Sequence, residues 1–430
     1  VTLSLQGRAV GCTVRLEKRE DPFAKGCGML DSINFREIKV GMTTSRVVYL
    51  YNETPEQCKF CFAIKGDTSA FGFSRTRGEI PAAGTEHPGE AHITLNFCPS
   101  LPTNYYRRVF CLLENQLPLV MDLMGTGYLV AKGEVEEQRP APLRHAHVQA
   151  FRNRQNVALG RSSPGELQDL LSAEGMSDLF ARVGPQGTPP LQRCGISKPL
   201  TRSGEATRVR TAVAAEFFVD PADGDLNDVY LDRSCLDFGF VSEKRRESVT
   251  LHNNTNTEVY VAWNLETGGQ GDSRAAALSV SPADADVPSG GSAVFHVELS
   301  PSKRNCYFSE EVEAFVSPSN QRTFRTVNDA TQQPPWCLPL NVLGHSFAGG
   351  HFLAKVSLST HHTGQRLCFP ACHVGDTVYQ AIRVSNQGNT PASFRFGSDP
   401  SGAFEVKPVA GVIPASDFQL CVARFTPPAL

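Results

Sequence analysis

Apolar and polar residues alternate with a period of two along most of this chain. The clearest example is residues 236–241, Leu-Asp-Phe-Gly-Phe-Val, followed by a polar turn and by a segment in which Val249 and Leu251 alternate with polar residues up to Asn253. A period of two is typical of β-strands with one buried face. Because turn residues separate such segments at short intervals, the pattern predicts an all-β fold.

This order of two strands around a polar turn occurs three times. The step from the phenylalanine to the glycine is six residues in both outer copies, and the step to the asparagine is 17 in both and 15 in the middle copy. We interpret this as an internal repeat of a small β domain, in which the phenylalanines lie in the core and the asparagines begin turns. The shared positions are Phe35, Gly41 and Asn52, then Phe238, Gly239 and Asn253, then Phe369, Gly375 and Asn386.

The later half of the repeat keeps the same phase. Residues 278–301 and 404–427 both begin with an apolar-x-Val-x-Pro pattern and both end at a proline 23 residues later. About seven strands in roughly 100 residues is the spacing of an immunoglobulin-like sandwich. The predicted organisation is the last strands of a preceding domain at 1–20, Ig-like domains at 21–130 and 229–347, an incomplete one at 351–430, and a linker or insertion at 131–228.

One segment of the insertion has the pattern of a helix. Residues 163–166, Ser-Pro-Gly-Glu, form a capping box with proline at the first helical position. Leu167, Leu170 and Leu171 then give an apolar stripe at helical spacing. A short helix near 164–180 is therefore predicted, so the insertion is partly helical.

Composition narrows the class of protein. The chain has 430 residues, with 41 basic and 44 acidic side chains and a net charge of −3, which does not predict a nucleic-acid-binding protein. No run approaches the ~20 apolar residues of a membrane span, and the start of the chain lacks the features of a signal peptide. The 13 cysteines are odd in number and irregularly spaced, which favours free thiols in a reducing, cytosol-facing compartment.

The cysteines form two groups that could be mistaken for metal or redox sites. Cys58 and Cys61 make a Cys-x-x-Cys, but two thiols at this spacing on a strand face opposite sides of the sheet. Cys368, Cys372 and His373 lack a fourth ligand. Core packing is the favoured interpretation of both groups.

Catalytic patterns are also missing from the sequence. No Gly-x-Ser-x-Gly elbow and no Gly-x-x-x-x-Gly-Lys phosphate loop occurs. The neighbouring carboxylates Glu310 and Glu311 lie beside a predicted strand start and are expected to be solvated. The sequence therefore predicts a protein that is not an enzyme, with no catalytic, cofactor-binding or metal-binding residues and no cofactor.

Charge is distributed unevenly. Between Arg139 and Ala214, 11 basic side chains stand against five acidic ones, so this part carries +6 and the rest of the chain −9. A basic, proline-rich insertion suits docking on an acidic partner such as the tubulin lattice, and a solvated linker is the alternative. The candidate partner contacts are Arg144, Arg152, Arg154, Arg161, Arg202, Arg208 and Arg210.

The recurring pattern apolar-Asp-Phe-Gly-x-Val, Asn, Phe-x-Val-x-Pro, Val-x-Phe-x-Pro and Leu-x-Gly resembles the immunoglobulin-like domains of the ASH and major-sperm-protein class. Tandem arrays of these domains are typical of Hydin-like cilia- and flagella-associated proteins. The resemblance covers about three-quarters of the chain and is closest at 236–241, whereas Arg36 and Pro370 stand where the pattern has glycine.

The resemblance implies tandem ASH/major-sperm-protein-type sandwiches in a structural scaffold of the ciliary or flagellar axoneme, of central-apparatus type. It implies a cytoplasmic, cytoskeletal location, other axonemal proteins and tubulin or microtubules as partners, and no nucleic acid or membrane within this segment. We expect the sandwiches to form a stiff rod whose edge strands bind neighbours. Alternatives are a cytosolic module that binds peptide motifs through Lys244, Arg245 and Arg246, a centrosomal adaptor, and an extracellular adhesion array.

Overall fold

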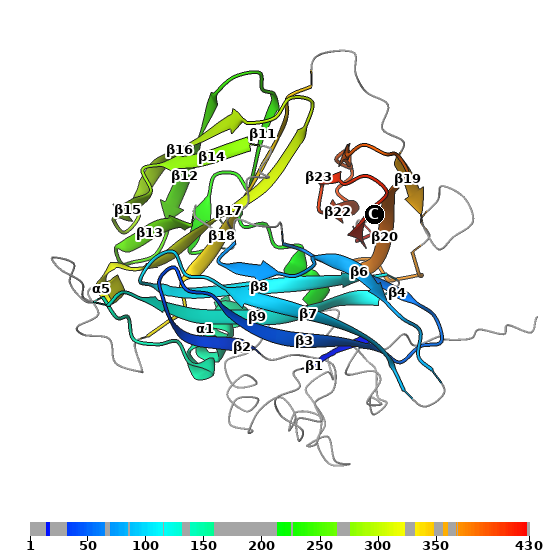
Figure 1. Ribbon diagram of the computed structural model, residues 1–430, viewed down its shortest axis with the longest axis horizontal. Helices are drawn as coiled ribbons and strands as arrows, with labels where there is room; N and C mark the ends of the chain where they lie inside the picture. Colours follow the sequence, from blue (N-terminus) through cyan, green and yellow to red (C-terminus); the bar gives the residue numbers. More distant parts are fainter. Residues whose placement is uncertain are drawn as a thin grey trace, which may run out of the picture.

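Strands grouped into three sandwich units make up most of the regular structure of this chain (Figure 1). The computed structural model describes residues 14–17, 32–64, 69–84, 87–114, 116–130, 138–158, 213–224, 227–264, 276–322, 332–347, 356–359, 367 and 369–427. The predicted class, all-β with tandem immunoglobulin-like sandwiches, is confirmed. The helix predicted near 164–180 lies outside the described residues.

Sandwich 1 is built from two sheets. The four-stranded sheet has the order β1 (Val14–Glu17), β3 (Thr44–Asn52), β7 (Gly89–Phe97), β5 (Phe71–Phe73). The five-stranded sheet has the order β2 (Ile33–Lys39), β9 (Gln116–Tyr128), β8 (Asn104–Leu113), β4 (Cys58–Phe62), β6 (Arg77–Ile80). Strand β2 runs parallel to β9, and the other pairs are antiparallel.

Sandwich 2 repeats this topology. Its four-stranded sheet is β10 (Val229–Leu231), β12 (Arg245–Asn253), β16 (Ser292–Pro301), β14 (Ala276–Ser281). Its five-stranded sheet is β11 (Cys235–Phe240), β18 (Trp336–His345), β17 (Tyr307–Pro318), β13 (Val259–Asn264), β15 (Asp284–Val287). A one-turn helix, α5 (Ser319–Arg322), follows β17. Because β11 is again parallel to β18, the two sandwiches share one connectivity.

The third unit has the same four-stranded sheet but a smaller second sheet in the described residues. The first sheet is β19 (Val356–Ser359), β20 (Val378–Asn386), β24 (Phe418–Phe425), β22 (Phe404–Lys407). The second sheet contains only β21 (Ala392–Arg395) and β23 (Ala410–Ile413).

The first strand of each unit corrects one predicted boundary. Val14, Val229 and Val356 are each paired with the asparagine that ends the next long strand of their sheet. Residues 14–17 are therefore the first strand of sandwich 1, and their assignment to a preceding domain was wrong. A Val-x-Leu at the start of all three units was the signal for this strand. The rest of 1–20 lies outside the described residues.

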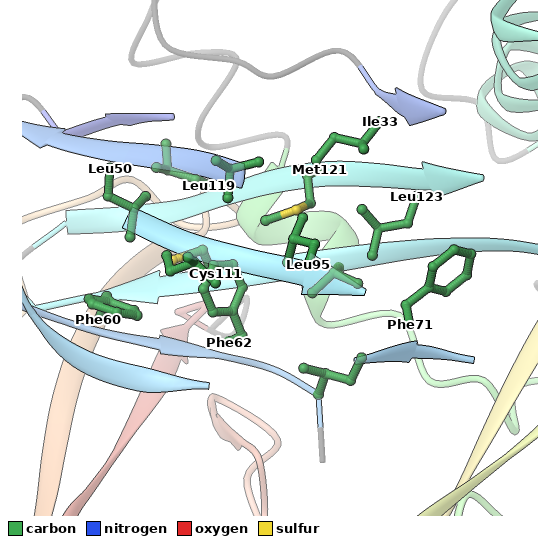
Figure 2. Packing of buried hydrophobic residues seen from close by; sticks show 14 of the residues in the cluster. Ile33, Leu50, Phe60, Phe62, Phe71, Leu95, Cys111, Leu119, Met121 and Leu123 are labelled. Atoms are coloured by element: carbon green, nitrogen blue, oxygen red, sulfur yellow. The ribbon is translucent and has the colours of Figure 1, made fainter. Parts of the chain in front are cut away.

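Aromatic and aliphatic side chains from both sheets fill sandwich 1 (Figure 2). Phe35, Phe71 and Phe97 contact one another with ring centroids 5.1–5.8 Å apart. Leu119, Met121 and Leu123 of β9 point into the same core, as the alternation predicts. Each large side chain buried in this way contributes about 1.5–3 kcal/mol to folding.

The repeated asparagines close the turn between two strands. Asn253 is 1 % exposed, and its Nδ2 donates to the carbonyl oxygens of Thr257, Val287 and Pro288 at 2.9–3.1 Å. Its Oδ1 accepts from the backbone N–H of Thr255 at 3.0 Å. Asn52 and Asn386 are buried in the same way and make equivalent bonds to carbonyls of Glu56, Pro81, Thr390, Ile413 and Pro414. This is the turn role expected from the sequence.

The helix α1 (His145–Ala158) was not predicted. Few of its residues are apolar, so it lacks a broad stripe. Val148 and Phe151 nevertheless pack with Leu143 against Tyr106 and Met124 of sandwich 1. Tertiary contact, not periodicity, therefore accounts for this helix.

Candidate functional site

Strand β8 is the element around which the described parts of the chain meet. On one of its faces, Tyr105, Val109 and Cys111 point into the core of sandwich 1. On the other face, Tyr106, Arg108, Phe110 and Leu112 contact α1, residues 213–218 and the third unit. We call these four residues the outer face of β8. A strand that is apolar on both faces is typical of a buried strand.

The joint between sandwiches 1 and 2 is centred on a buried arginine. Arg107 of β8 pairs with two carboxylates of β17, Glu311 at 2.5 Å and Glu313. Glu313 also accepts from the Ser69 hydroxyl at 2.7 Å and from the Ala70 N–H at 3.0 Å. All three charged side chains are buried, with Glu313 fully so. The expectation that Glu310 and Glu311 are both solvated was therefore wrong for Glu311.

The two carboxylates of this joint raise the pKa of its arginine. Burial alone would lower the pKa of the Arg107 guanidinium, but Glu311 and Glu313 raise it by more, so the net shift is upward. Burial, followed by the charge of Glu313, raises the pKa of the neighbouring Cys337 thiol, so that thiol stays protonated. One cation against two carboxylates leaves a formal excess of negative charge, which the two donors of Ser69 and Ala70 help to stabilise.

An apolar contact and a hydrogen bond extend the joint. The ring of Phe315, from β17, contacts Tyr105 at 4.9 Å and joins the core of sandwich 1. The Ser100 hydroxyl donates to Asn264 Oδ1 at 2.5 Å. Helix α1 reaches sandwich 2 as well, through Phe151 and Trp336 with centroids 5.8 Å apart. Sandwich 2 is therefore held at several separate points.

Residues 213–218 form a wedge between sandwich 1 and the third unit. Phe217 packs on Phe110 of β8 at 5.2 Å. Phe218 packs on Tyr379 of β20 at 5.6 Å, and its carbonyl oxygen accepts from Lys407 Nζ at 2.7 Å. The same segment thus touches both units with adjacent aromatic rings.

Glu216 fixes this wedge on sandwich 1. Its carboxylate lies 3.2 Å from Arg108 of β8 and 2.7 Å from Arg152 of α1. Arg108 also pairs with Asp122 of β9 at 3.2 Å. Because Arg152 holds Glu216, the middle of α1 and residue 216 are held together although they are 64 positions apart in sequence.

The third unit also contacts sandwich 1 directly. Arg77 of β6 donates to the carbonyl oxygen of Phe418 at 2.7 Å, and Arg383 pairs with Glu114 at 2.6 Å. Sandwich 1 contacts both of the other units, which lie above it in Figure 1 and touch each other through the ion pair of Arg395 with Asp237. The expected rod was therefore wrong, because units in a rod contact only their sequence neighbours. The apolar outer face of β8 is the physical reason for the compact arrangement.

The arginines predicted to contact a partner differ in exposure. Arg144 is exposed just before α1, whereas Arg152 is paired with Glu216 and only 15 % exposed. Arg152 therefore stabilises the wedge and is not available to a partner. Arg154 lies in α1, but its side chain is outside the description, as are Arg161, Arg202, Arg208 and Arg210.

Of the cysteines that the structure describes, four are buried, four are half-buried and Cys235 is exposed. Cys58 points into the core of sandwich 1 and Cys61 onto the third unit, so the two thiols face opposite sides as predicted. Cys372 is half-buried and His373 exposed, and Cys368 is outside the description. The nine cysteines that the structure describes form no disulfide, and no group of three metal-binding side chains occurs among the described residues.

The basic cluster considered for peptide binding is partly neutralised within its own sandwich. Lys244 pairs with Glu298 at 2.5 Å, and Arg245 with Glu247 at 3.2 Å. No described helix is long and apolar enough to cross a membrane.

Sequence reasoning missed the residues that make the joints. Arg107 and Glu313 stand inside apolar alternation, which is a signal for a buried ion pair. Phe217 and Phe218 are adjacent aromatics at the end of a polar insertion, which marks an anchoring segment.

Comparisons with known proteins agree with the predicted resemblance. A family model described as "CFAP65, fourth Ig-like domain" matches residues 32–130, which hold all of sandwich 1 except β1. The cilia- and flagella-associated protein 65 of Chlamydomonas reinhardtii is 29 % identical over 99 % of this chain and 17 % of its own length. The mouse protein is 26 % identical over 89 % of this chain and 20 % of its own length. The chain thus spans about a fifth of the length of the curated relatives it matches.

Among solved structures, an ASH/PapD-like domain of human CEP192 covers 28 % of this chain and 84 % of that chain, with 15 % identity and a TM-score of 0.22. WR4, a major-sperm-protein family member of C. elegans, covers 27 % of this chain and 98 % of that chain, with 6 % identity and a TM-score of 0.19. The resemblance to Hydin-like cilia- and flagella-associated proteins, and to the one numbered sixty-five, is confirmed by the family model and the relatives. Across nearly its whole length, the chain is similar to one part of cilia- and flagella-associated protein 65.

Proposed function

We propose that this chain is a non-enzymatic scaffold segment of a ciliary or flagellar axoneme. It would act as one rigid block that holds neighbouring axonemal proteins at fixed positions. The observation that carries the proposal is that sandwich 2, the third unit, α1 and the wedge all contact β8 or the strands beside it. These contacts are buried ion pairs and aromatic contacts. A domain array that bends freely would need no buried charges at its joints.

The relatives support the location. They are named cilia- and flagella-associated proteins, which agrees with the localisation expected from the sequence. The finer assignment, to the central apparatus, rests on the resemblance to Hydin-like proteins. Other axonemal proteins are the proposed partners.

Axonemal retention tests the location. The tagged chain, expressed in ciliated cells, should remain with axonemes after detergent removes the membrane and soluble matrix. Complete extraction of the chain with the soluble matrix would overturn the scaffold role. Axonemes that lack the central pair should lose the chain, and normal retention on them would overturn the central-apparatus assignment alone.

Direct contact with tubulin is a separate part of the proposal. Among the predicted contacts, Arg144 is described and exposed, and the chain between Arg139 and Ala214 carries +6. Purified chain should co-sediment with microtubules at low salt and be released as salt rises. Arg144→Ala/Arg154→Ala should weaken this binding, whereas the exposed Arg233→Ala in sandwich 2 is the matched control. No co-sedimentation at low salt would remove tubulin from the partners.

A further inference from the structure

The outer face of the four-stranded sheet is covered in the third unit and open in the two sandwiches. The asparagine that ends the second strand of each sheet sets the same register, so equivalent positions can be compared. Leu420 of β24 corresponds to His92 of β7 and to Val294 of β16. Leu420 is 0 % exposed, whereas His92 is exposed and Val294 is 51 % exposed. Another part of the chain therefore covers this face in the third unit.

Two cations border the covered face. Lys407 of β22 is paired with Val422 across the ladder, and Arg424 follows two residues further along β24. The position of Arg424 is taken by Glu298 in sandwich 2. One carboxylate, Glu405, pairs with Arg424 at 2.5 Å and lies 3.9 Å from Lys407, so the two cations keep a positive excess. The third unit thus differs from sandwich 2 in carrying positive charge beside an apolar surface.

The ring of Phe218 lies on this face. Its centroid is 5.6 Å from that of Tyr379, 5.2 Å from the Arg424 guanidinium and 5.9 Å from the Lys407 ammonium. Cations over an aromatic ring are attracted by its negative face. The Lys407 ammonium also donates to the Phe218 carbonyl oxygen at 2.7 Å. One phenylalanine therefore has apolar, cationic and hydrogen-bonding partners on the third unit.

The residues after Phe218 place negative charge near the same cations. Asp220 and Asp223 follow it by two and five positions. Burial lowers the pKa of the Lys407 ammonium, and the carboxylate of Asp220 is the charge that opposes this shift most strongly, with Asp223 acting in the same direction. A phenylalanine followed by two carboxylates is complementary to a face that combines apolar and cationic side chains.

Residues 213–224 lie against the third unit without belonging to any strand. They form a helical turn and a loop, in which the Phe218 N–H donates to Ala215 O at 3.2 Å and the Val219 N–H donates to Glu216 O at 3.0 Å. These backbone bonds lie within the segment, so its side chains and one carbonyl make the contacts with the third unit. A separate peptide can make contacts of this kind, because they need no shared ladder.

We propose that the outer sheet face of the third unit is a binding site for short acidic segments that carry a phenylalanine, and that residues 216–223 occupy it as an intramolecular ligand. The phenylalanine lies between Tyr379, Lys407 and Arg424, and the carboxylates two and five residues later lie toward the cations. Another protein with such a segment competes with residues 216–223 for this face. The wedge is then an occupant that can be exchanged and not a permanent part of the joint.

A fluorescently labelled peptide of residues 213–224 tests the site on the full chain. The variant Phe217→Ala/Phe218→Ala empties the face, and neither ring belongs to the core of a sandwich. By fluorescence anisotropy, the emptied chain should bind the peptide at least about tenfold more tightly than the intact chain, because the intact segment competes at high effective concentration. A peptide carrying Phe218→Ala should bind at least about tenfold more weakly, and higher salt should weaken binding of the unchanged peptide.

Charge substitutions locate the site. In the emptied chain, Lys407→Gln/Arg424→Gln should weaken peptide binding. The matched control is Lys244→Gln/Arg246→Gln at the corresponding sheet of sandwich 2, which should leave binding unchanged. No binding to the emptied chain, or equal binding to the emptied and intact chains, would overturn the proposal. An equal loss in the two charge variants would also overturn it, because attraction to any basic surface would then explain the binding.

The intact chain gives a second measurement that does not depend on the emptied variant. Excess unlabelled peptide should displace the wedge from an isotope-labelled chain. The amides of Phe218 and Val219, which are bonded within the wedge, should then exchange faster with solvent. Unchanged exchange at saturating peptide would show that the wedge is a fixed part of the joint and would overturn the exchangeable site.

Discussion

Arg36 in sandwich 1 and Gly239 in sandwich 2 occupy the same backbone position, with left-handed φ of 63° and 60°. In both, the backbone N–H donates to the side-chain oxygen two residues earlier. The N–H of Arg36 donates to Asn34 Oδ1 at 2.7 Å, and the N–H of Gly239 donates to Asp237 Oδ1 at 3.0 Å. Strands β2 and β11 shift register against their parallel partners at this point. An Asn or Asp side chain therefore shapes the bulge, with or without glycine.

Exchanging these residue types should change stability in opposite directions. A left-handed conformation costs a non-glycine residue about 1–2 kcal/mol, partly offset by the larger unfolded-state entropy of glycine. Arg36→Gly should therefore raise the free energy of unfolding of sandwich 1 by up to about 1 kcal/mol. Gly239→Arg should lower that of sandwich 2 by about 1 kcal/mol. Urea unfolding measures both, and a loss of stability in Arg36→Gly would contradict the argument.

Replacing Asn253 by alanine should cost more free energy of unfolding than replacing its exposed neighbour Asn254. Asn253→Ala removes the donor for three carbonyl groups in a buried turn, which should cost about 3 kcal/mol in the free energy of unfolding. Asn254 is exposed and makes one side-chain bond, to Gly224 O at 3.2 Å, so Asn254→Ala should cost less than about 1 kcal/mol. Similar losses in the two variants would show that the buried network is not what stabilises the turn.

Period-two alternation was enough to predict the strands and the repeat. Phe35 and Phe238 lie in cores, and the asparagines lie in turns, because these roles depend on local sequence. Phe369 is only half-buried, and the second sheet of its unit contains only β21 and β23 in the described residues. The repeat pattern alone does not report how deeply each copy of the phenylalanine is buried.

The joints could not be predicted in the same way. Arg107 meets Glu313 across 206 positions, and Arg77 meets Phe418 across 341. A period in the sequence reports which face of a strand is buried, but not which distant segment buries it. Helix α1 was missed for this reason too, since Val148 and Phe151 gain their apolar environment from sandwich 1 and not from the helix itself.

Ionisation of the Tyr105 hydroxyl should lower the free energy of unfolding in strongly alkaline solution. Burial raises the pKa of its hydroxyl from 10.0 to about 12, so the folded protein keeps it neutral while the unfolded chain ionises. Its contribution is therefore complete below pH 10 and is lost as the pH rises through about 12, a loss of about 2–3 kcal/mol.

The variant Tyr105→Phe isolates this effect. Phe308 occupies the equivalent position in sandwich 2, so a phenylalanine fits the fold there. The free energy of unfolding should be measured from pH 9 to 12 for the protein and for Tyr105→Phe. As the pH rises, it should fall more in the protein than in the variant. A difference that does not vary with pH would refute the assignment to Tyr105.

Replacing Arg107 alone should destabilise the folded protein more than replacing Arg107, Glu311 and Glu313 together. Arg107→Met leaves Glu311 and Glu313 buried without a cation, which should cost about 3–5 kcal/mol. The triple variant Arg107→Met/Glu311→Leu/Glu313→Gln has no buried charge and keeps an acceptor for Ser69 and Ala70. It should recover more than half of the loss in chemical unfolding. A triple variant no more stable than the single one would show that packing, not charge, governs the joint.

The ring of Phe218 should be required for stable docking of the third unit on sandwich 1. Its ring is 6 % exposed between Tyr379, Leu420 and Val422, so Phe218→Ala removes apolar contact from the wedge and should weaken docking by about 3 kcal/mol. The sandwiches themselves lose no core residue. Small-angle scattering should therefore show a larger radius of gyration, while the circular dichroism of the strands stays the same.

The matched control is Phe240→Ala, which truncates a 51 % exposed ring on sandwich 2 and should leave the radius of gyration unchanged. Cross-linking between cysteines placed at Arg383 and Glu114 reports the same joint, because these side chains lie 2.6 Å apart in the docked form. The yield of this cross-link should fall in Phe218→Ala and not in Phe240→Ala. An undiminished yield in Phe218→Ala would mean that the direct contacts of Arg77 and Arg383 hold the third unit without the wedge, and that residues 213–218 only rest on a joint formed by others.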